Sequence, residues 1–367
     1  MNSIENIDTF IFLVNIENYI NNCKKILEFL KEEKELAKLN FEKNKNNDYL
    51  ITLNHLQFVL DKTGTKGYSF ILSNDNFNIC IAEYISNIKN CKPIKIRISS
   101  QALWQFGLEN SYNYIIKWIE ETFGKISQES VYRIDLACHN NNDFITNYDK
   151  CYKGLFKKKS ITLSGNKINA ICFGSRKNDL IYCRIYNKSL EIKETRSKTW
   201  FKEIWQNNNL DITNVWNLEF EIKSEFLREK NLTTFQEVYD HIQTLWKYCT
   251  TNWLSKVNLD NSRISRCSIS NDWIELREKF ENFSNSSFVN LEDIEKENAQ
   301  SLLPTLVGYL TSYSSNKNLT TLSSTLAALK IDSNNYFKSK NTTFEQRVLD
   351  KIKLKGDYTL NDKISHS

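Results

Sequence analysis

Tyrosine and cationic side chains alternate in one short segment of this 367-residue chain, Tyr182-Cys183-Arg184-Ile185-Tyr186-Asn187-Lys188. Period-two alternation is typical of a β-strand, whose successive side chains point to opposite faces of the sheet. Tyr182, Arg184, Tyr186 and Lys188 then share one face. A tyrosine hydroxyl has a pKa of about 10 and is a poor nucleophile at neutral pH unless cations stabilise its anion. We therefore predict a reactive phenol at Tyr186, beside Arg184 and Lys188, with Tyr182 as the rival nucleophile.

Two further segments alternate in the same way and carry carboxylates. They are Val131-Tyr132-Arg133-Ile134-Asp135-Leu136 and Trp216-Asn217-Leu218-Glu219-Phe220-Glu221-Ile222-Lys223. Asp135 and Glu219 fall on the face of Tyr186 if all three segments join one sheet. Their oxygens are the ligands that Mg²⁺ and Mn²⁺ prefer. Transfer of a phosphodiester needs a nucleophile, cations against the developing charge and usually a carboxylate-held metal. The predicted chemistry is attack by the phenol with Mg²⁺ or Mn²⁺ as cofactor, which leaves a DNA strand bonded to the protein.

Helical patterns separate the strand-like segments and indicate the fold class. Strands are predicted at 94–99, 131–136, 171–174, 180–188 and 216–223, and helices at 111–123 and 234–253. This order predicts an α+β fold, in which an antiparallel sheet turns its apolar side chains towards helices on one face. The opposite, open face would carry Lys95, Arg97, Arg133, Asp135, Tyr182, Arg184, Tyr186, Lys188, Asn217, Glu219, Glu221 and Lys223.

The polar face also has a plainer interpretation. Mixed charges on a sheet are often held only by cross-strand ion pairs and water, and alternation alone does not separate that case from a site. The chain would then be a protein-binding α+β domain with a solvated face.

Basic residues are concentrated in one part of the chain. Residues 150–202 contain 14 Lys and Arg against three acids, a local net charge of +11, whereas the whole chain carries +5. A basic segment in an otherwise acidic chain is typical of a polyanion site. The run at 157–159 could by itself be a solvated loop. We predict DNA contacts by Arg97, Arg133, Lys157, Lys158, Lys159, Arg176, Lys177 and Tyr182.

Several classes of protein are disfavoured by the sequence. The apolar run at 10–14 is far shorter than the roughly 18–20 residues of a membrane helix, and no basic segment precedes it. We therefore expect a cytoplasmic protein without membrane contact, with its nine cysteines reduced. The four histidines are scattered and no CxxC pair occurs, which argues against a zinc site. The segment 64–67 lacks the spacing of a phosphate-binding loop.

Two features suggest how the chain is organised. A strand, a polar turn and an amphipathic helix recur at 96–104 and 220–228, which suggests an internally duplicated strand–helix unit. Residues 1–283 are expected to form the α+β domain, and residues 284–367 a C-terminal helical segment with a polar tail. The apolar helices of that segment could pair with a second copy of the chain or fold back on the sheet domain.

Several motifs in order resemble one family. Gly174-Ser175-Arg176-Lys177-Asn178-Asp179 followed by the tyrosine strand resembles the signature of the replication initiation factors, which are rolling-circle initiators of the trans-acting Rep family, related to relaxases of conjugative transposons. Arg133-Ile134-Asp135-Leu136 resembles their "RiD" strand, and 216–221 their "W-x-R-x-E" strand. The turn at 99–104 is also similar. The resemblance covers about residues 65–255.

The resemblance implies metal-dependent, site-specific nicking and joining of one DNA strand at an origin. The nucleophile would be Tyr186, and the metal ligands would be Asp135 and Glu219 together with Glu221. DNA, a second copy of the chain and a host helicase are the implied partners. Asn217 stands where members often carry arginine. The alternative function is therefore a catalytically silent DNA-binding regulator that uses the same basic face.

Overall fold

The computed structural model describes residues 2–44, 49–84, 92–281 and 283, together with residues 307, 310, 311, 313–339, 342–346, 348 and 349. The chain divides into two units, Met1–Phe288 and Val289–Ser367, and each is described here by itself. The predicted boundary between residues 283 and 284 borders residues outside the described ranges, so it stays a prediction.

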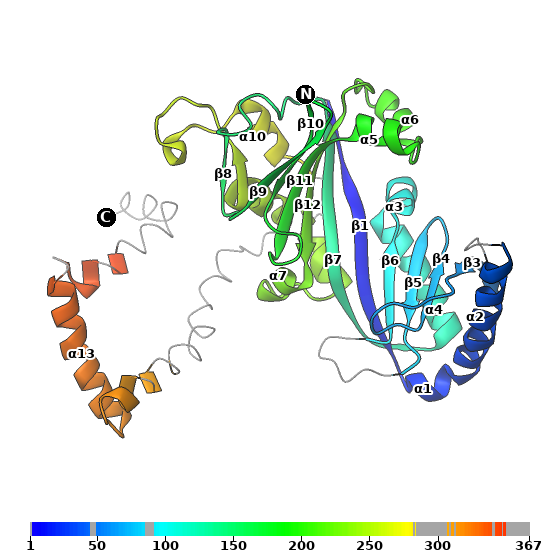
Figure 1. Ribbon diagram of the computed structural model, residues 1–367, viewed down its shortest axis with the longest axis horizontal. Coiled ribbons are helices and arrows are strands. Elements are labelled where there is room, and N and C mark those ends of the chain that lie inside the picture. Colours follow the sequence, from blue (N-terminus) through cyan, green and yellow to red (C-terminus); the bar gives the residue numbers. More distant parts are fainter. Residues whose placement is uncertain are drawn as a thin grey trace, which may run out of the picture. The chain divides into compact units, whose positions relative to one another are not determined.

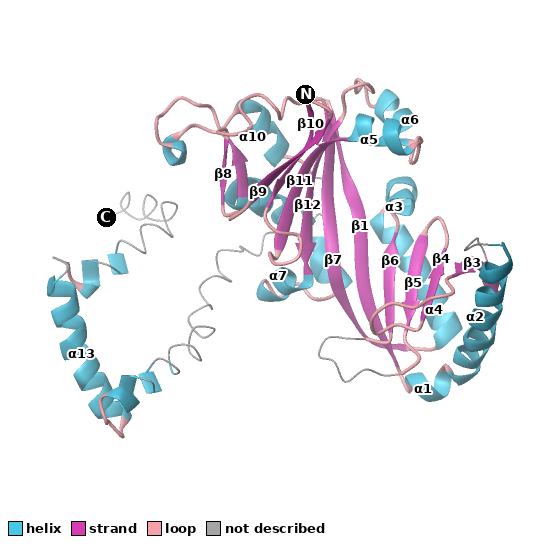
Figure 2. Cartoon of the chain, in the orientation of Figure 1, coloured by secondary structure: helices cyan, strands magenta, loops and turns pink. Residues whose placement is uncertain are grey.

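An antiparallel sheet of eleven strands runs through the described residues of the first unit (Figure 1). Its order is β2 (Leu50–Leu53), β3 (Leu56–Leu60), β4 (Phe70–Ser73), β5 (Phe77–Ile81), β6 (Ile94–Ile98), β1 (Ser3–Ile16), β7 (Ile126–Asn140), β12 (Trp216–Lys223), β11 (Ile181–Asn187), β10 (Lys167–Phe173) and β9 (Lys159–Ser164). The long strands β1 and β7 pair at its centre. A separate pair joins β8 (Tyr152–Gly154) to β13 (Leu254–Lys256). The predicted α+β class with an antiparallel sheet is confirmed (Figure 2).

The apolar side chains of the central strands are buried against helices, as predicted. Ile96, Ile134 and Phe220 are fully buried in one cluster with Trp118 of α4 (Leu108–Phe123) and Trp246 of α9 (Ile242–Tyr248). Burial of each such side chain contributes about 1.5–3 kcal/mol to folding. The other helices of this unit are α1 (Tyr19–Asn22), α2 (Lys24–Asn44), α3 (Ser100–Phe106), α5 (Lys188–Thr195), α6 (Phe201–Asn207), α7 (Ser224–Glu229), α8 (Phe235–Asp240) and α10 (Asn271–Arg277), with a π-helical turn at Cys249–Trp253 and a 3₁₀ turn at Ile264–Arg266.

Short helices also cover part of the polar face, near the end of β11. His139 lies on the same face as Asp135, four residues along β7. Trp205 of α6 donates its indole N–H to His139 Nδ1 at 3.0 Å, and the ring of Trp104 in α3 stacks on the imidazole with 4.7 Å between centroids. The face predicted to be open is therefore partly covered, because an aromatic cluster of α3 and α6 packs on it.

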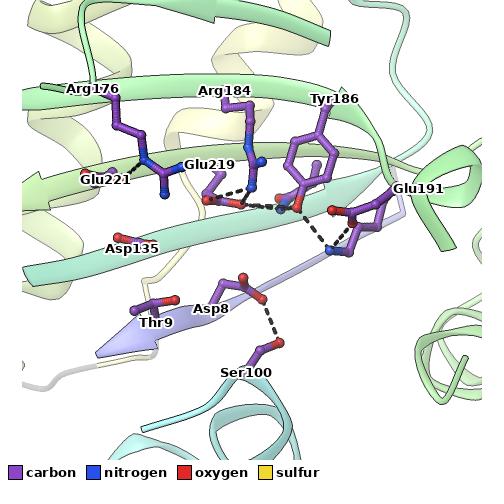
Figure 3. Close-up of polar contacts among 12 residues, drawn as sticks. Asp8, Thr9, Ser100, Asp135, Arg176, Arg184, Tyr186, Glu191, Glu219 and Glu221 are labelled. Carbon is purple, nitrogen blue, oxygen red and sulfur yellow. Dashed lines mark hydrogen bonds and ion pairs between the residues drawn. The ribbon is translucent and has the colours of Figure 1, made fainter. Parts of the chain in front are cut away.

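An irregularity in β1 brings an extra side chain to this face. The pairing of β1 with β7 shifts between Ile7, opposite Leu136, and Thr9, opposite Asp135, so that Asp8 is an extra residue in β1. Such a bulge bends the strand and turns two successive side chains towards the same side. Asp8 and Thr9 both lie beside Asp135 (Figure 3).

The strand order is similar on either side of the central pair. β6 lies beside β1 and leads into α3, and β12 lies beside β7 and leads into α7. The two strand–helix units noted in the sequence occupy these matching places. Internal duplication itself stays a prediction.

The second unit contains α13 (Leu322–Ser339), in agreement with the predicted C-terminal helical segment. Tyr313 donates its hydroxyl to Asp332 Oδ2 at 2.6 Å, which ties the preceding residues to this helix. Much of the predicted apolar run at 302–310 lies outside the described residues. None of the helices in the described ranges is long and apolar enough to cross a membrane.

We predict that Ser99→Ala lowers the free energy of unfolding by about 1 kcal/mol. Ser99 caps α3, since its Oγ accepts the amide of Ala102 at 3.2 Å and donates to the carbonyl of Asp75 at 2.6 Å. Urea unfolding gives the measurement. Ser99→Asn is the matched control, because asparagine is also a preferred N-cap residue, and it should lose less stability. Equal stability of Ser99→Ala and the parent would contradict the cap.

Candidate active site

The hydroxyl of Tyr186 lies in a network of polar side chains near the end of β11 (Figure 3). Lys188 Nζ and Asn217 Nδ2 each donate to Tyr186 Oη at 3.0 Å. Tyr186 Oη donates in turn to Glu219 Oε2 at 3.2 Å. The guanidinium of Arg184 lies 4.1 Å from the centroid of the phenol ring. The side chain is buried, but its reactive atom is surrounded by charged and amide groups.

Strand register explains why these residues meet. In the pairing of β11 with β12, Tyr186 lies opposite Asn217 and Arg184 lies opposite Glu219. Side chains two residues apart on a strand share a face, so both pairs project to the same side. The pairing of β12 with β7 places Glu221 opposite Asp135 in the same way. The predicted convergence of the tyrosine strand with both carboxylate strands is therefore present.

Each of the three carboxylates predicted on this face, Asp135, Glu219 and Glu221, is paired with an arginine. Glu219 contacts Arg184 Nη2 at 3.2 and 3.3 Å. Arg133 donates to both oxygens of Asp135, at 2.7 and 2.5 Å, and also contacts Glu221 at 2.8 Å. Arg176 donates to Glu221 as well, at 2.8 Å. We name these six residues, Arg133, Asp135, Arg176, Arg184, Glu219 and Glu221, the ion-pair network.

The donor set of the network suits a hard divalent cation, but its oxygens are not gathered around one point. Asp135 and Glu221 are opposite one another on adjacent strands, and Glu219 is two residues further along β12. Carboxylate oxygens are the ligands that Mg²⁺ and Mn²⁺ prefer. Within the described ranges, however, no group of three or more His, Cys, Asp and Glu side chains is arranged to hold a metal. A cation would have to replace the guanidinium partners.

Burial governs the protonation of this face. Burial raises the pKa of Tyr186 well above its usual value, and the charge of Glu219 raises it further. Burial also raises the pKa of Asp135 to about 7, with Glu219 and Glu221 adding to the shift and Arg133 opposing it. The free site therefore holds Tyr186 as a neutral phenol at pH 7.

A fourth carboxylate, Asp8, reaches this face and was missed by the sequence analysis. Asp8 is buried and accepts the hydroxyl of Ser100 at 2.8 Å. Burial alone would raise the pKa of Asp8, but the charges of Lys198 and Lys188 outweigh it and hold the pKa below its usual range. Its position depends on the bulge in β1, which alternation does not predict.

The residues predicted to contact DNA divide into two groups. Arg97, Arg133, Arg176 and Tyr182 lie on the polar face, where Arg97 reaches Thr9 Oγ1 at 3.4 Å and Arg176 lies 6.0 Å from the ring of Tyr182. The second group comprises Lys157 and Lys158, which are exposed before β9, with Lys159 at its start and Lys177 in the turn after β10. The amide of Gly174 donates to the carbonyl of Lys158 at 2.8 Å, so that this turn and the lysine run are neighbours.

Lys188, predicted to act with Tyr186, is held from two sides. It is 1% exposed and forms an ion pair with Glu191 of α5 at 2.5 Å, while its ammonium lies 5.3 Å from the ring of Phe201. The carboxylate of Glu191 compensates the charge of the buried ammonium and so fixes Lys188 against the phenol.

Comparisons with known proteins find similarity in structure. No family model matches the chain, and no curated protein sequence matches it. A solved structure, described as the rolling circle replication initiator protein from Geobacillus stearothermophilus, is similar with a TM-score of 0.45 and 13% sequence identity; the match covers 77% of this chain and 98% of that one.

We predict that His139 makes the fold sensitive to mild acid. Burial, together with the charge of Lys188, lowers the pKa of His139 to about 3. An unfolded chain binds a proton at this histidine below pH of about 6.5, whereas the folded chain excludes it, so stability falls as the pH drops from about 6.5 towards 3. Between pH 6.5 and 5.5 the parent should lose about 1 kcal/mol more than His139→Gln in urea unfolding.

The exposed His55 provides the matched control. His55→Gln should keep the pH dependence of the parent. If His139→Gln keeps it as well, the imidazole is not excluded from protonation in the fold.

Proposed function

We propose that this chain is a strand transferase of the rolling-circle initiator or relaxase kind, which nicks and rejoins one DNA strand through a covalent bond to Tyr186. One observation carries the proposal: Tyr186 Oη sits between two donors, Lys188 and Asn217, and one acceptor, Glu219, on a sheet face that also bears the three arginines of the ion-pair network. This combination supplies a nucleophile, an acceptor for its proton and cations for a phosphate.

The chain's own residues account for the first transfer. As Tyr186 Oη forms a bond to phosphorus, its proton passes along the existing hydrogen bond to Glu219 Oε2. Lys188 and Asn217 keep their donors on the phenolic oxygen while its negative charge develops. The bond from phosphorus to the leaving deoxyribose oxygen breaks, and that oxygen takes up a proton. Attack by the freed hydroxyl on the phosphotyrosine reverses these steps and rejoins the strand.

The arginines would change partners when DNA binds. Arg184 and Arg176 are 32% and 56% exposed, so their guanidinium groups border both the buried carboxylates and the solvent. Guanidinium binds phosphate by the same paired N–H donors that it offers to carboxylate. Movement of these two side chains towards a phosphate would also open the route to Tyr186, which is 4% exposed.

Asp135 and Glu221 would hold the divalent metal, Mg²⁺ or Mn²⁺, together with Glu219 through the oxygen that does not take the phenolic proton. This requires Arg133, as well as Arg176 and Arg184, to leave the carboxylates. The bound ion would supply Lewis-acid stabilisation of charge on the phosphoryl oxygens. Asp8 is not needed as a ligand in this arrangement, since Ser100 already occupies one of its oxygens.

A catalytically silent DNA-binding regulator is the second candidate. The burial of Tyr186 and the presence of Asn217 beside it favour this alternative, because the free protein has a neutral phenol and one cation fewer than the resembled pattern. The basic residues would then bind DNA without forming a covalent bond. Homodimer formation, a host helicase partner and a cytoplasmic location stay predictions for both candidates.

We predict that Tyr186→Phe abolishes covalent attachment to DNA. Labelled single-stranded DNA from the region that encodes this chain, incubated with the parent and Mn²⁺, should give a band that survives boiling in detergent. The band should be absent in Tyr186→Phe, because the oxygen nucleophile is missing. Chelation of the metal should also abolish the band in the parent. Tyr182→Phe is the matched control on the same strand and should retain the adduct.

The outcomes separate the candidates. If Tyr186→Phe still forms the adduct and Tyr182→Phe does not, Tyr182 is the nucleophile. If the parent binds this DNA but forms no adduct at any Mn²⁺ concentration, the regulator is the correct function.

We also predict that Arg176→Ala weakens DNA binding through loss of a phosphate contact. The slope of log K against log salt concentration should become less negative by about 1. Lys38→Ala is the control, because Lys38 is an exposed cation of α2 that pairs with Glu35 and is not among the residues predicted to contact DNA. Fluorescence anisotropy over a salt series measures both. Identical slopes for the parent and Arg176→Ala would remove Arg176 from the interface.

A further inference from the structure

A pocket of about 320 Å³ lies apart from the ion-pair network, between the turn that joins β4 to β5 and the junction of α3 with α4. Among the residues that line it are Leu56, Asn76, Phe77, Phe106, Asn110 and Tyr114. The volume is at the small end of the range of ligand pockets, which start at about 300 Å³. It can admit one ring system rather than a duplex or a folded partner.

Two of the lining rings are exposed, although the helices that carry them, α3 and α4, pack on the core. Phe106 is 54% and Tyr114 is 48% exposed. The ring of Tyr114 stacks on the buried Phe77, with an interplanar angle of 10° and 6.0 Å between centroids, so one of its faces is supported. Flat, supported and accessible aromatic rings are the feature on which unpaired bases stack in single-strand binding proteins.

Amide groups complete the lining. Asn110 Nδ2 donates to the carbonyl of Phe106 at 3.0 Å, while in the described part of the chain no hydrogen bond engages Asn110 Oδ1 or the side-chain amide of Asn76. Asparagine amides are suited to the paired donor and acceptor on the edge of a base. No lysine or arginine is among the lining residues, which favours a base over a phosphate as occupant.

Helix α3 connects this pocket to the proposed reaction site. Ser100 at its start donates to Asp8 on the polar face, and Phe106 at its end lines the pocket. Seven helical residues span about 10 Å. Gly107 follows with a φ of +79°, a left-handed conformation that turns the chain into α4 and sets Phe106 beside Asn110. A strand crossing the polar face therefore needs only a few nucleotides to reach the pocket.

We propose that this pocket binds one unpaired nucleobase of the DNA strand, stacked on Tyr114 and Phe106 with its edge on the amides of Asn76 and Asn110. The inference rests on the proposed DNA function and deepens it, because it assigns a base-reading position a few nucleotides from the phosphate that Tyr186 attacks.

The test uses the full chain carrying Tyr186→Phe, so that binding is measured without cleavage. Single-stranded oligonucleotides of about 16 nucleotides, each with one abasic position, are scanned by fluorescence anisotropy. One abasic position should lower affinity about tenfold. Phe106→Ala and Tyr114→Ala should lower affinity for the intact oligonucleotide by a similar factor, and the abasic position should then cost nothing further. Their salt slopes should equal that of the parent, because no phosphate contact is lost.

Tyr336→Ala is the matched control, since Tyr336 is an exposed tyrosine of α13 that does not line the pocket. Circular dichroism confirms that each variant is folded, and Tyr114→Phe, which keeps the ring, should bind like the parent. If no abasic position lowers the affinity, or if Phe106→Ala and Tyr114→Ala bind intact DNA as the parent does, the pocket does not bind a base. The proposed DNA function would be unaffected by that result. Absence of any DNA binding at low salt would overturn both.

Discussion

Charge compensation between arginine and carboxylate groups on a covered sheet face is the constraint on which the rest of this structure depends. Asp135, Glu219 and Glu221 are each about 5% exposed or less. An isolated charge in such a place costs several kcal/mol, and removal of one partner from a buried pair is strongly destabilising. The antiparallel register compensates these charges, because it sets Arg184 opposite Glu219 and brings Arg133 within reach of Asp135 and Glu221.

The same pairing links binding to chemistry. In the free chain the arginines neutralise the carboxylates, so neither set is available to a ligand. Under the proposed function, a phosphate that engages Arg184 and Arg176 would free Glu219 of its arginine and leave Glu221 paired with Arg133 alone, and a cation that engages those carboxylates would release the arginines. Each ligand therefore lowers the cost of the other, and thermodynamic linkage makes this effect reciprocal. Under the proposed function, the network would therefore favour joint binding of metal and DNA.

The sequence predicted the strands well and their surroundings less well. The alternation of apolar and polar residues placed Tyr186, Asp135 and Glu219 on the polar face. This inference does not depend on which strands are neighbours, because each strand turns its apolar side chains to the buried face. It could not predict the bulge that adds Asp8, since a bulge depends on the pairing of β1 with β7. It also missed the cover formed over His139 by Trp104 and Trp205, because segments far apart in sequence meet there.

The burial of Tyr186 has a physical consequence for the proposed reaction. A phenol in water is exposed to solvent and to unintended electrophiles, whereas Tyr186 is held neutral by burial and beside its proton acceptor, Glu219. The pKa of Tyr186 can fall only when positive charge outweighs burial and the carboxylate next to it. Arg184 lowers it, but burial and the charge of Glu219 outweigh that effect. In the proposed reaction the further positive charge would come with the substrate complex, so the phenolate would form only when a phosphate is present to receive it.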